Sequence, residues 1–120
     1  SGVTSSSKEL TITSDGNPIF LNVNGDNNPL STTSWFNINI YRNGTLLANQ
    51  ICESHASSWN IPFSLSYLDI VAAGTYTYKF EFTIGGGATR LGENGSAQTP
   101  QCMAYELGTN KGLYTWKRTG

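Results

Sequence analysis

The sequence predicts an all-β fold, and three observations lead to this conclusion. Residues 75–84 alternate strictly between large apolar side chains and polar ones, which is the period of a strand with one packed and one solvated face. Shorter alternating segments recur along the chain, each bounded by Gly, Asn, Asp or Pro. No segment shows the 3.6-residue periodicity of an amphipathic helix. We therefore expect an antiparallel β-sandwich, jelly roll or barrel.

Each expected strand is defined by its alternation and by the turn residues beside it. Asp15-Gly16-Asn17-Pro18 predicts a turn, and residues 24–29 form a loop by composition. Asn43-Gly44 predicts a tight hairpin, because a type I′ turn requires positive φ at both central residues. Pro62 lacks an amide donor, which favours a sheet edge. In chain order the expected strands are 9–13, 19–24, 35–41, 45–52, 59–67, 75–84, 88–91 and 102–107.

The aromatic strand at 75–84 is expected to dominate the core, because its inward side chains bury a large apolar area. Alternatively, some of the tyrosines of this strand lie in an interface between subunits and not in the core. Gly74 comes just before this strand, and a bend with positive φ explains a glycine there. The aromatic residues assigned to the core or to a subunit interface are Tyr76, Tyr78, Phe80, Phe82 and Tyr105.

The length of 120 residues predicts a single domain. Residues 1–7 indicate a polar linker or a vector-derived remnant, 8–107 the β domain, and 108–120 a C-terminal extension or last strand. Charged residues make up 12% of the chain, against roughly 25% in an average soluble domain. The net charge is −1 and the cations are scattered, which argues against nucleic-acid binding. No apolar run is long enough to insert into a membrane.

Patterns that would indicate catalysis or metal binding are weak. His55 is the only histidine, so a Ser or Cys nucleophile has no evident base and orienting partner. Asn22, Asn24, Asp26 and Asn28 have the alternate spacing of calcium ligands, but a turn built from Asx residues is the favoured interpretation. We expect no enzymatic activity, no cofactor and no metal.

Two other sets of residues leave alternatives open. Cys52 and Cys102 either remain two thiols, the favoured interpretation, or form a disulfide worth about 4 kcal/mol in the chain-entropy model. Trp35, Trp59 and Trp116 either form a platform on which sugars stack or serve in core packing and subunit contact.

A resemblance to a known family is carried by three segments between residues 36 and 107. They are the hairpin at Asn43-Gly44, the stretch 67–78 with Tyr67-Leu68-Asp69 and Gly74-Thr75, and the closing Ala104-Tyr105-Glu106-Leu107. This order resembles the receptor-binding tip domains of bacteriophage tail fibres and tail-tip host-specificity proteins, in which YLD-x-P-x-x-GT-x-TY and A-x-E-L segments recur. Val71 departs from the family pattern, which often has Pro there.

The resemblance implies a tumour necrosis factor-like jelly roll that assembles as a homotrimer. It also implies a virion location and attachment to a host outer-membrane protein or surface glycan. Loops are expected to carry the binding, since a rigid sheet presents loops that vary. Two other functions stay open, a carbohydrate-binding module or lectin and a structural virion spike or decoration domain. The candidate receptor-binding residues are Asn24, Asp26, Asn27, Asn28, Glu53, His55, Ser57, Trp59, Glu93, Asn94 and Gln98.

Overall fold

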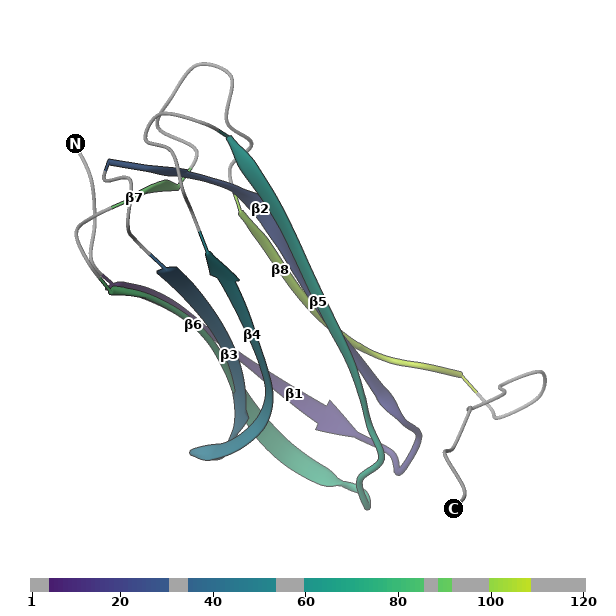
Figure 1. Cartoon of the computed structure of the whole chain (residues 1–120). Helices are drawn as coiled ribbons and strands as arrows, with labels where there is room; N and C mark the ends of the chain where they lie inside the picture. The colour runs from purple at the N-terminus through teal and green to yellow at the C-terminus, as the bar shows by residue number, and fades with distance from the viewer. Residues whose placement is uncertain (1–4, 31–34, 54–59, 86–88, 92–99, 109–120) are drawn as a thin grey trace, which may run out of the picture.

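A computed structural model describes residues 5–30, 35–53, 60–85, 89–91 and 100–108, and their regular structure is all strand (Figure 1). Every strand pairing is antiparallel. The prediction of an all-β chain with two antiparallel sheets is therefore confirmed. The strands are β1 (Ser5–Ser14), β2 (Ile19–Pro29), β3 (Trp35–Arg42), β4 (Thr45–Glu53), β5 (Ile61–Asp69), β6 (Gly74–Gly85), β7 (Thr89–Leu91) and β8 (Gln101–Glu106).

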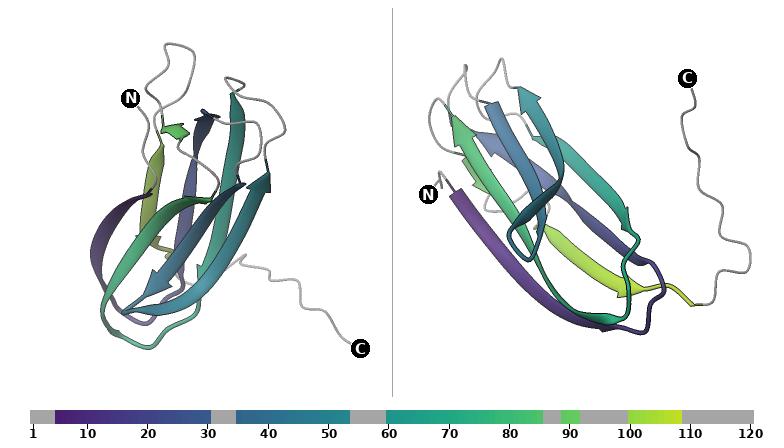
Figure 2. Two further views of the ribbon diagram at one scale, coloured as in Figure 1. Left: turned by 60° about the vertical axis from the view of Figure 1, so that its left-hand side comes forward. Right: turned by 90° about the horizontal axis from the view of Figure 1, so that it is seen from below.

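The two sheets lie face to face, as Figure 2 shows. The first sheet has the order β1-β6-β3-β4. In the second, β2 is central, with β5 on one side and both β7 and β8 paired to it as well. Pro62 lies in β5, which pairs only with β2 among the described strands, so the expected edge position is confirmed.

The core fills the space between the sheets and is built from the inward side chains of both. Phe36 of β3, Phe63 of β5 and Phe82 of β6 form a three-ring cluster with centroid distances of 5.2, 5.6 and 5.8 Å. Because these rings come from opposite sheets, their packing joins the two layers. The buried apolar residues are Ile19, Leu21, Val23, Phe36, Ile38, Ile40, Phe63, Tyr78, Phe80 and Phe82.

The end of the sandwich that carries the described turns is here called the hairpin end. Asn43 and Gly44 have φ of 46° and 85°, which confirms the tight hairpin between β3 and β4. The Asn43 side chain accepts a hydrogen bond of 2.9 Å from the backbone N–H of Thr77, and this contact fastens the hairpin to β6. Gly16 has a φ of 103°, as a turn between β1 and β2 requires.

The expectation for Gly74 is wrong, because its φ is not positive. A Cβ at this position would instead lie 3.3 Å from the hydroxyl oxygen of Tyr76. That hydroxyl donates a hydrogen bond of 2.7 Å to the carbonyl of Ala72. The absence of a side chain at Gly74 thus leaves room for the tyrosine, and no special backbone conformation is involved.

Asp69 joins the two sheets at the hairpin end through an ion pair in which the carboxylate is buried and the guanidinium is partly exposed. Its carboxylate accepts a hydrogen bond of 2.7 Å from the Tyr78 hydroxyl and pairs with the Arg42 guanidinium. Asp69 lies in the second sheet, whereas Arg42 and Tyr78 lie in the first. Desolvation and the bond to Asp69 raise the pKa of Tyr78, so its hydroxyl stays protonated as a donor. Asp69 belongs to the Tyr67-Leu68-Asp69 segment, so this segment has a structural role.

Two boundaries differ from the sequence expectation. The first strand begins at Ser5, inside the expected linker, because its pairing with β6 extends to Ser5↔Thr83. The predicted loop at residues 24–29 is wrong, because β2 continues to Pro29. Over that stretch β2 pairs with β5 as far as Asn27↔Ile61 and with β7 as far as Pro29↔Thr89. The expected extension at 109–120 lies outside the described residues.

Candidate functional site

The candidate receptor-binding residues do not form one loop cluster in the described structure. Asn24, Asp26, Asn27 and Asn28 lie within β2, and Glu53 is the exposed last residue of β4. These four residues of β2 are therefore strand residues and not loop tips. The other candidates lie outside the described residues, namely His55, Ser57, Trp59, Glu93, Asn94 and Gln98.

Asn27 and Asn28 are buried, with 1% and 0% of their surface exposed. The Asn27 amide donates to the backbone carbonyl of Ile61 at 3.2 Å, and its carbonyl accepts from the Thr89 hydroxyl at 3.3 Å. The Asn28 amide donates to the side-chain oxygen of Asn60 at 2.8 Å. Because buried amides must be hydrogen-bonded, these side chains hold the neighbouring segments onto β2. Both side chains are buried and bonded within the protein, so they are not exposed receptor contacts in this structure.

The outer face of the second sheet carries an apolar cluster that we call the Phe20 face, made of Phe20, Leu68, Met103 and Tyr105. Phe20 of β2 is opposite Leu68 of β5 and Tyr105 of β8. The rings of Phe20 and Tyr105 have a centroid distance of 5.5 Å. Tyr105 is 45% exposed and Met103 42%. Large apolar side chains that gather on one exposed face are typical of a contact surface.

Beside the Phe20 face, the amides of β2 bond to each other and to β5. The Asn24 amide donates to the Asn22 side-chain oxygen at 2.8 Å, and the Asn22 amide donates to the Ser66 hydroxyl at 2.7 Å. The alternate Asx spacing therefore belongs to a strand, and the interpretation as a turn is wrong. Among the described residues no three His, Cys, Asp or Glu side chains gather as a metal would require.

Glu106 of β8 closes the turn between β1 and β2. Its Oε2 accepts hydrogen bonds from the backbone N–H of Asp15 at 2.7 Å, from the hydroxyl of Ser14 at 3.0 Å and from the N–H of Asn17 at 3.1 Å. Desolvation opposes ionisation, but these three donors outweigh it and lower the pKa of Glu106. The closing Ala104-Tyr105-Glu106-Leu107 segment therefore includes a carboxylate that fixes the chain reversal.

At the opposite end, the outer face of the first sheet carries an exposed tryptophan. Trp35 opens β3, is 46% exposed, and is paired in register with Gly85 of β6 and Glu53 of β4. The next outward row pairs Asn37 with Thr83 and Ile51. We call this surface the Trp35 platform, defined as Trp35, Asn37, Ile51, Glu53, Thr83 and Gly85.

The sequence interpretation identified Trp35 and Glu53 but missed the other members of the Trp35 platform. Alternation places Asn37 on the same side of β3 as Trp35, and this signal was present in the sequence. The neighbours from β6 depend on a register that spans about fifty residues of chain. No local pattern indicates that Gly85 lies beside Trp35.

Further along the same face, a charged cluster is already satisfied within the protein. Glu81 accepts hydrogen bonds of 3.2 Å from the Asn39 amide and from the Tyr41 hydroxyl. The Lys79 ammonium lies 3.6 Å from Glu81 and 4.7 Å from the centroid of the Tyr41 ring. Because these groups neutralise one another, they stabilise the sheet and leave the Trp35 platform as the exposed aromatic part of this face.

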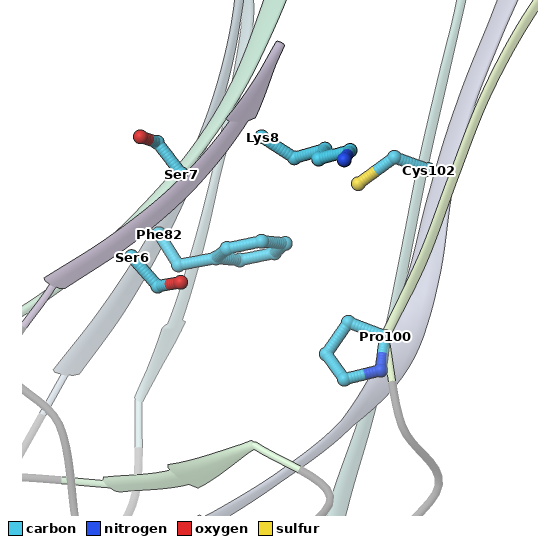
Figure 3. Close-up of a pocket in the computed structure, with 6 residues that line it drawn as sticks. All are labelled: Ser6, Ser7, Lys8, Phe82, Pro100 and Cys102. Carbon is cyan, nitrogen blue, oxygen red and sulfur yellow. The ribbon is translucent and has the colours of Figure 1, made fainter. Parts of the chain in front are cut away.

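A cavity of about 390 Å³ opens between the edge strands β1 and β8, and Figure 3 shows its lining. The Lys8 side chain extends toward Cys102, with Phe82 and Pro100 nearby. Desolvation raises the pKa of the Cys102 thiol, and Lys8 opposes this only in part. The thiol is therefore the neutral form at physiological pH and a weak nucleophile.

The two cysteines are free thiols, and no disulfide joins them. Cys52 lies in β4 and Cys102 in β8, which belong to different sheets. Burial raises the pKa of Cys52 as well. Both thiols pack at the border of the core as small apolar groups.

Among the described residues, no helix has the length and apolarity needed to cross a membrane. Comparison of the sequence with protein-family models and with curated proteins gave no match.

Proposed function

We propose that this chain is a non-enzymatic attachment domain at the tip of a bacteriophage tail fibre or tail tip. In this proposal it belongs to the virion and binds a receptor on the host bacterium, either an outer-membrane protein or a glycan. The resemblance between residues 36 and 107 is one support. The observation that carries the proposal is the strand order of the two sheets, because it agrees with the fold that the resemblance implies.

The strand order supports a jelly roll of the tumour necrosis factor-like kind. One sheet has the order β1-β6-β3-β4, and in the other β2 lies between β5 and β8. The chain therefore crosses repeatedly from one sheet to the other, which is how an eight-stranded jelly roll is wound. In a simple up-and-down arrangement, consecutive strands would be neighbours in a single sheet.

The Phe20 face supports assembly as a homotrimer. It offers exposed apolar side chains, and the outward positions of β2, β5 and β8 include one charged side chain, Asp26. Depletion of charge around aromatic and Met side chains is typical of the centre of a protein interface. We place the contact between subunits on this face.

Replacing Tyr105 with Asp tests the trimer. A carboxylate in the middle of the Phe20 face would be desolvated without a partner in each subunit, so we expect the trimer to dissociate into folded monomers. Mass from light scattering measures the assembly, and far-ultraviolet circular dichroism checks the fold. Ser64→Asp is the matched control, because Ser64 is an exposed residue of the same sheet outside the Phe20 face. A Tyr105→Asp chain that stays trimeric would contradict this placement.

Binding of the fluorescently labelled chain to a panel of bacterial strains tests the attachment function. We expect saturable binding to a subset of strains, competed by excess unlabelled chain, while denatured chain does not bind. Multivalency in a trimer raises the apparent affinity above that of a single site. If the folded chain binds no strain in a broad panel, the proposed attachment function fails.

A second candidate function, a carbohydrate-binding module or lectin, is favoured by the Trp35 platform. A solvent-exposed indole on the flat face of a sandwich is the kind of surface on which a sugar ring packs. This function and the attachment function differ in assembly. A monomer that binds sugars would favour the lectin, and a trimer that binds bacteria would favour the attachment domain.

A further inference from the structure

We infer that the Trp35 platform is a saccharide-binding site, so that the receptor of the domain is a neutral glycan. This inference rests on the proposed attachment function and narrows its receptor. It also moves the binding surface from the loops to the outer face of β6, β3 and β4. The orientation of one indole ring is the observation behind it.

The ring of Trp35 lies with one face over Gly85. A methyl group added to Gly85 would be 2.3 Å from Cε2, 2.4 Å from Cζ2 and 2.7 Å from Nε1 of the indole. Cε2 is bonded to both other atoms, and a methyl approaching the rim would be nearer to them than to Cε2. The methyl position therefore lies over the ring face. One face of the indole therefore lies against the bare backbone of Gly85.

The opposite face of the same ring points away from Gly85, and Trp35 is 46% exposed. A flat aromatic face held in one orientation loses little conformational freedom when a ligand packs on it. The C–H groups on one side of a pyranose ring form an apolar surface of matching shape. Stacking of such a ring requires an exposed indole face, and the exposure of Trp35 provides one.

The polar neighbours suit hydroxyl groups. Glu53 stands opposite Trp35, and Thr83 and Asn37 form the next row. Their carboxylate, hydroxyl and amide groups accept hydrogen bonds from sugar hydroxyls, and the hydroxyl and the amide also donate hydrogen bonds to them. The Asn37 side-chain oxygen has no hydrogen-bond partner, so a rotation of this amide gives a ligand hydroxyl an unused acceptor.

The charge of this surface favours a neutral glycan. The two outward rows of the platform contain one carboxylate, Glu53, and no Lys or Arg among their described residues. Among the described side chains, the cation on this side of β6 is Lys79, which is already engaged by Glu81 and the Tyr41 ring. A sialylated or phosphorylated glycan would find a carboxylate here and no free cation.

A second copy of the chain fits the Trp35 platform less well than a saccharide does. If two platforms met around a twofold axis, both Glu53 carboxylates would enter the same interface. Like charges brought together in this way oppose the contact. Ile51, which is 58% exposed, is the only large aliphatic side chain in the two described rows.

The experiment compares Trp35→Ala with the unaltered chain on two probes. One probe is a microarray of purified bacterial polysaccharides and lipopolysaccharides. The other is a bacterial strain to which the unaltered chain binds. We expect Trp35→Ala to weaken both kinds of binding by about tenfold or more, the usual consequence of truncating a central aromatic contact. Leu46→Ala removes another exposed apolar side chain of β4 and should leave both unchanged.

Gly85→Ala provides a second variant that keeps the tryptophan. Its methyl group displaces the indole from its position over the sheet, so saccharide binding should fall while the fold persists. Circular dichroism and light scattering check the fold and the assembly of each variant. The inference is overturned if Trp35→Ala binds saccharides as strongly as the unaltered chain does. It is also overturned if the only effect of this substitution is a lower mass of the assembly in light scattering.

The outcomes separate this inference from the attachment function. Binding to bacteria that is unaffected by Trp35→Ala and not competed by purified saccharide would overturn the platform and leave attachment intact. Binding to the microarray that depends on Trp35, with no binding to any strain, would support the platform and contradict attachment. Loss of both kinds of binding in Trp35→Ala supports both.

Discussion

The two ends of the sandwich differ in how their polar groups are used. At the hairpin end, Asp69 and Glu106 are fully engaged with Arg42, Tyr78 and the turn between β1 and β2. At the other end, Trp35 and Glu53 stand exposed. The groups at the two ends therefore differ in role, because those of the hairpin end bond within the protein and Trp35 and Glu53 are presented to solvent. Side chains that already bond within the protein explain the fold, and exposed ones indicate where a partner binds.

The largest loss of stability is expected at Asp69. Asp69→Asn removes the charge that pairs with Arg42, and the one remaining side-chain oxygen cannot replace both carboxylate oxygens, which accept from the guanidinium and from the Tyr78 hydroxyl. Removing one member of a buried pair costs about 3–5 kcal/mol, and we expect the lower part of that range because Arg42 is partly exposed. Urea denaturation measures the free energy of unfolding. A change below about 1 kcal/mol would show that Asp69 does not join the sheets.

A smaller loss is expected at Asn27, the buried amide at the Trp35 end. Asn27→Ala leaves the carbonyl of Ile61 and the hydroxyl of Thr89 without this partner. An unsatisfied buried group costs about 1–3 kcal/mol, so the free energy of unfolding should fall by this amount. Asn24→Ala, which truncates a partly exposed amide of the same strand, is the control and should cost less. Equal losses in both variants would contradict the role given to Asn27.

Glu106 should give the smallest effect, and one that depends on pH. Its folded-state pKa lies below the ordinary value of 4.5, so the carboxylate stabilises the fold above that value. This contribution is lost as pH falls through the lowered pKa. Glu106→Gln should therefore be less stable than the unaltered chain at pH 7, with the difference shrinking below about pH 4. Thermal unfolding at several pH values measures it, and a difference independent of pH would contradict this account.

Local pattern was sufficient to predict the strands whose inward residues are apolar. In β6, alternation predicted the side on which Tyr78, Phe80 and Phe82 lie, and these three are buried. It was insufficient at residues 24–29, where Asn and Asp indicated a loop but the chain continues as a strand. The reason is physical, because Asn27 is satisfied by Ile61 and Thr89, more than thirty residues away.

The candidate site depended even more on contacts distant in sequence. Glu53 and Trp35 were identified separately, and the register between β3 and β4 places them opposite each other. The place of Gly85 under the indole follows from the pairing of β3 with β6, which a single sequence does not encode locally. A Gly in a strand where another group approaches closely is a known signal, but it does not identify that group.

The assembly state tests the account most directly, because the two outer faces are assigned to different partners. Light scattering of the unaltered chain over a range of concentrations should give three times the chain mass of 13.0 kDa. Addition of a saccharide that binds the Trp35 platform should leave that mass unchanged. A monomer at high concentration, or a trimer that dissociates when saccharide binds, would contradict the assignment of the Phe20 face to self-contact and the Trp35 platform to the receptor.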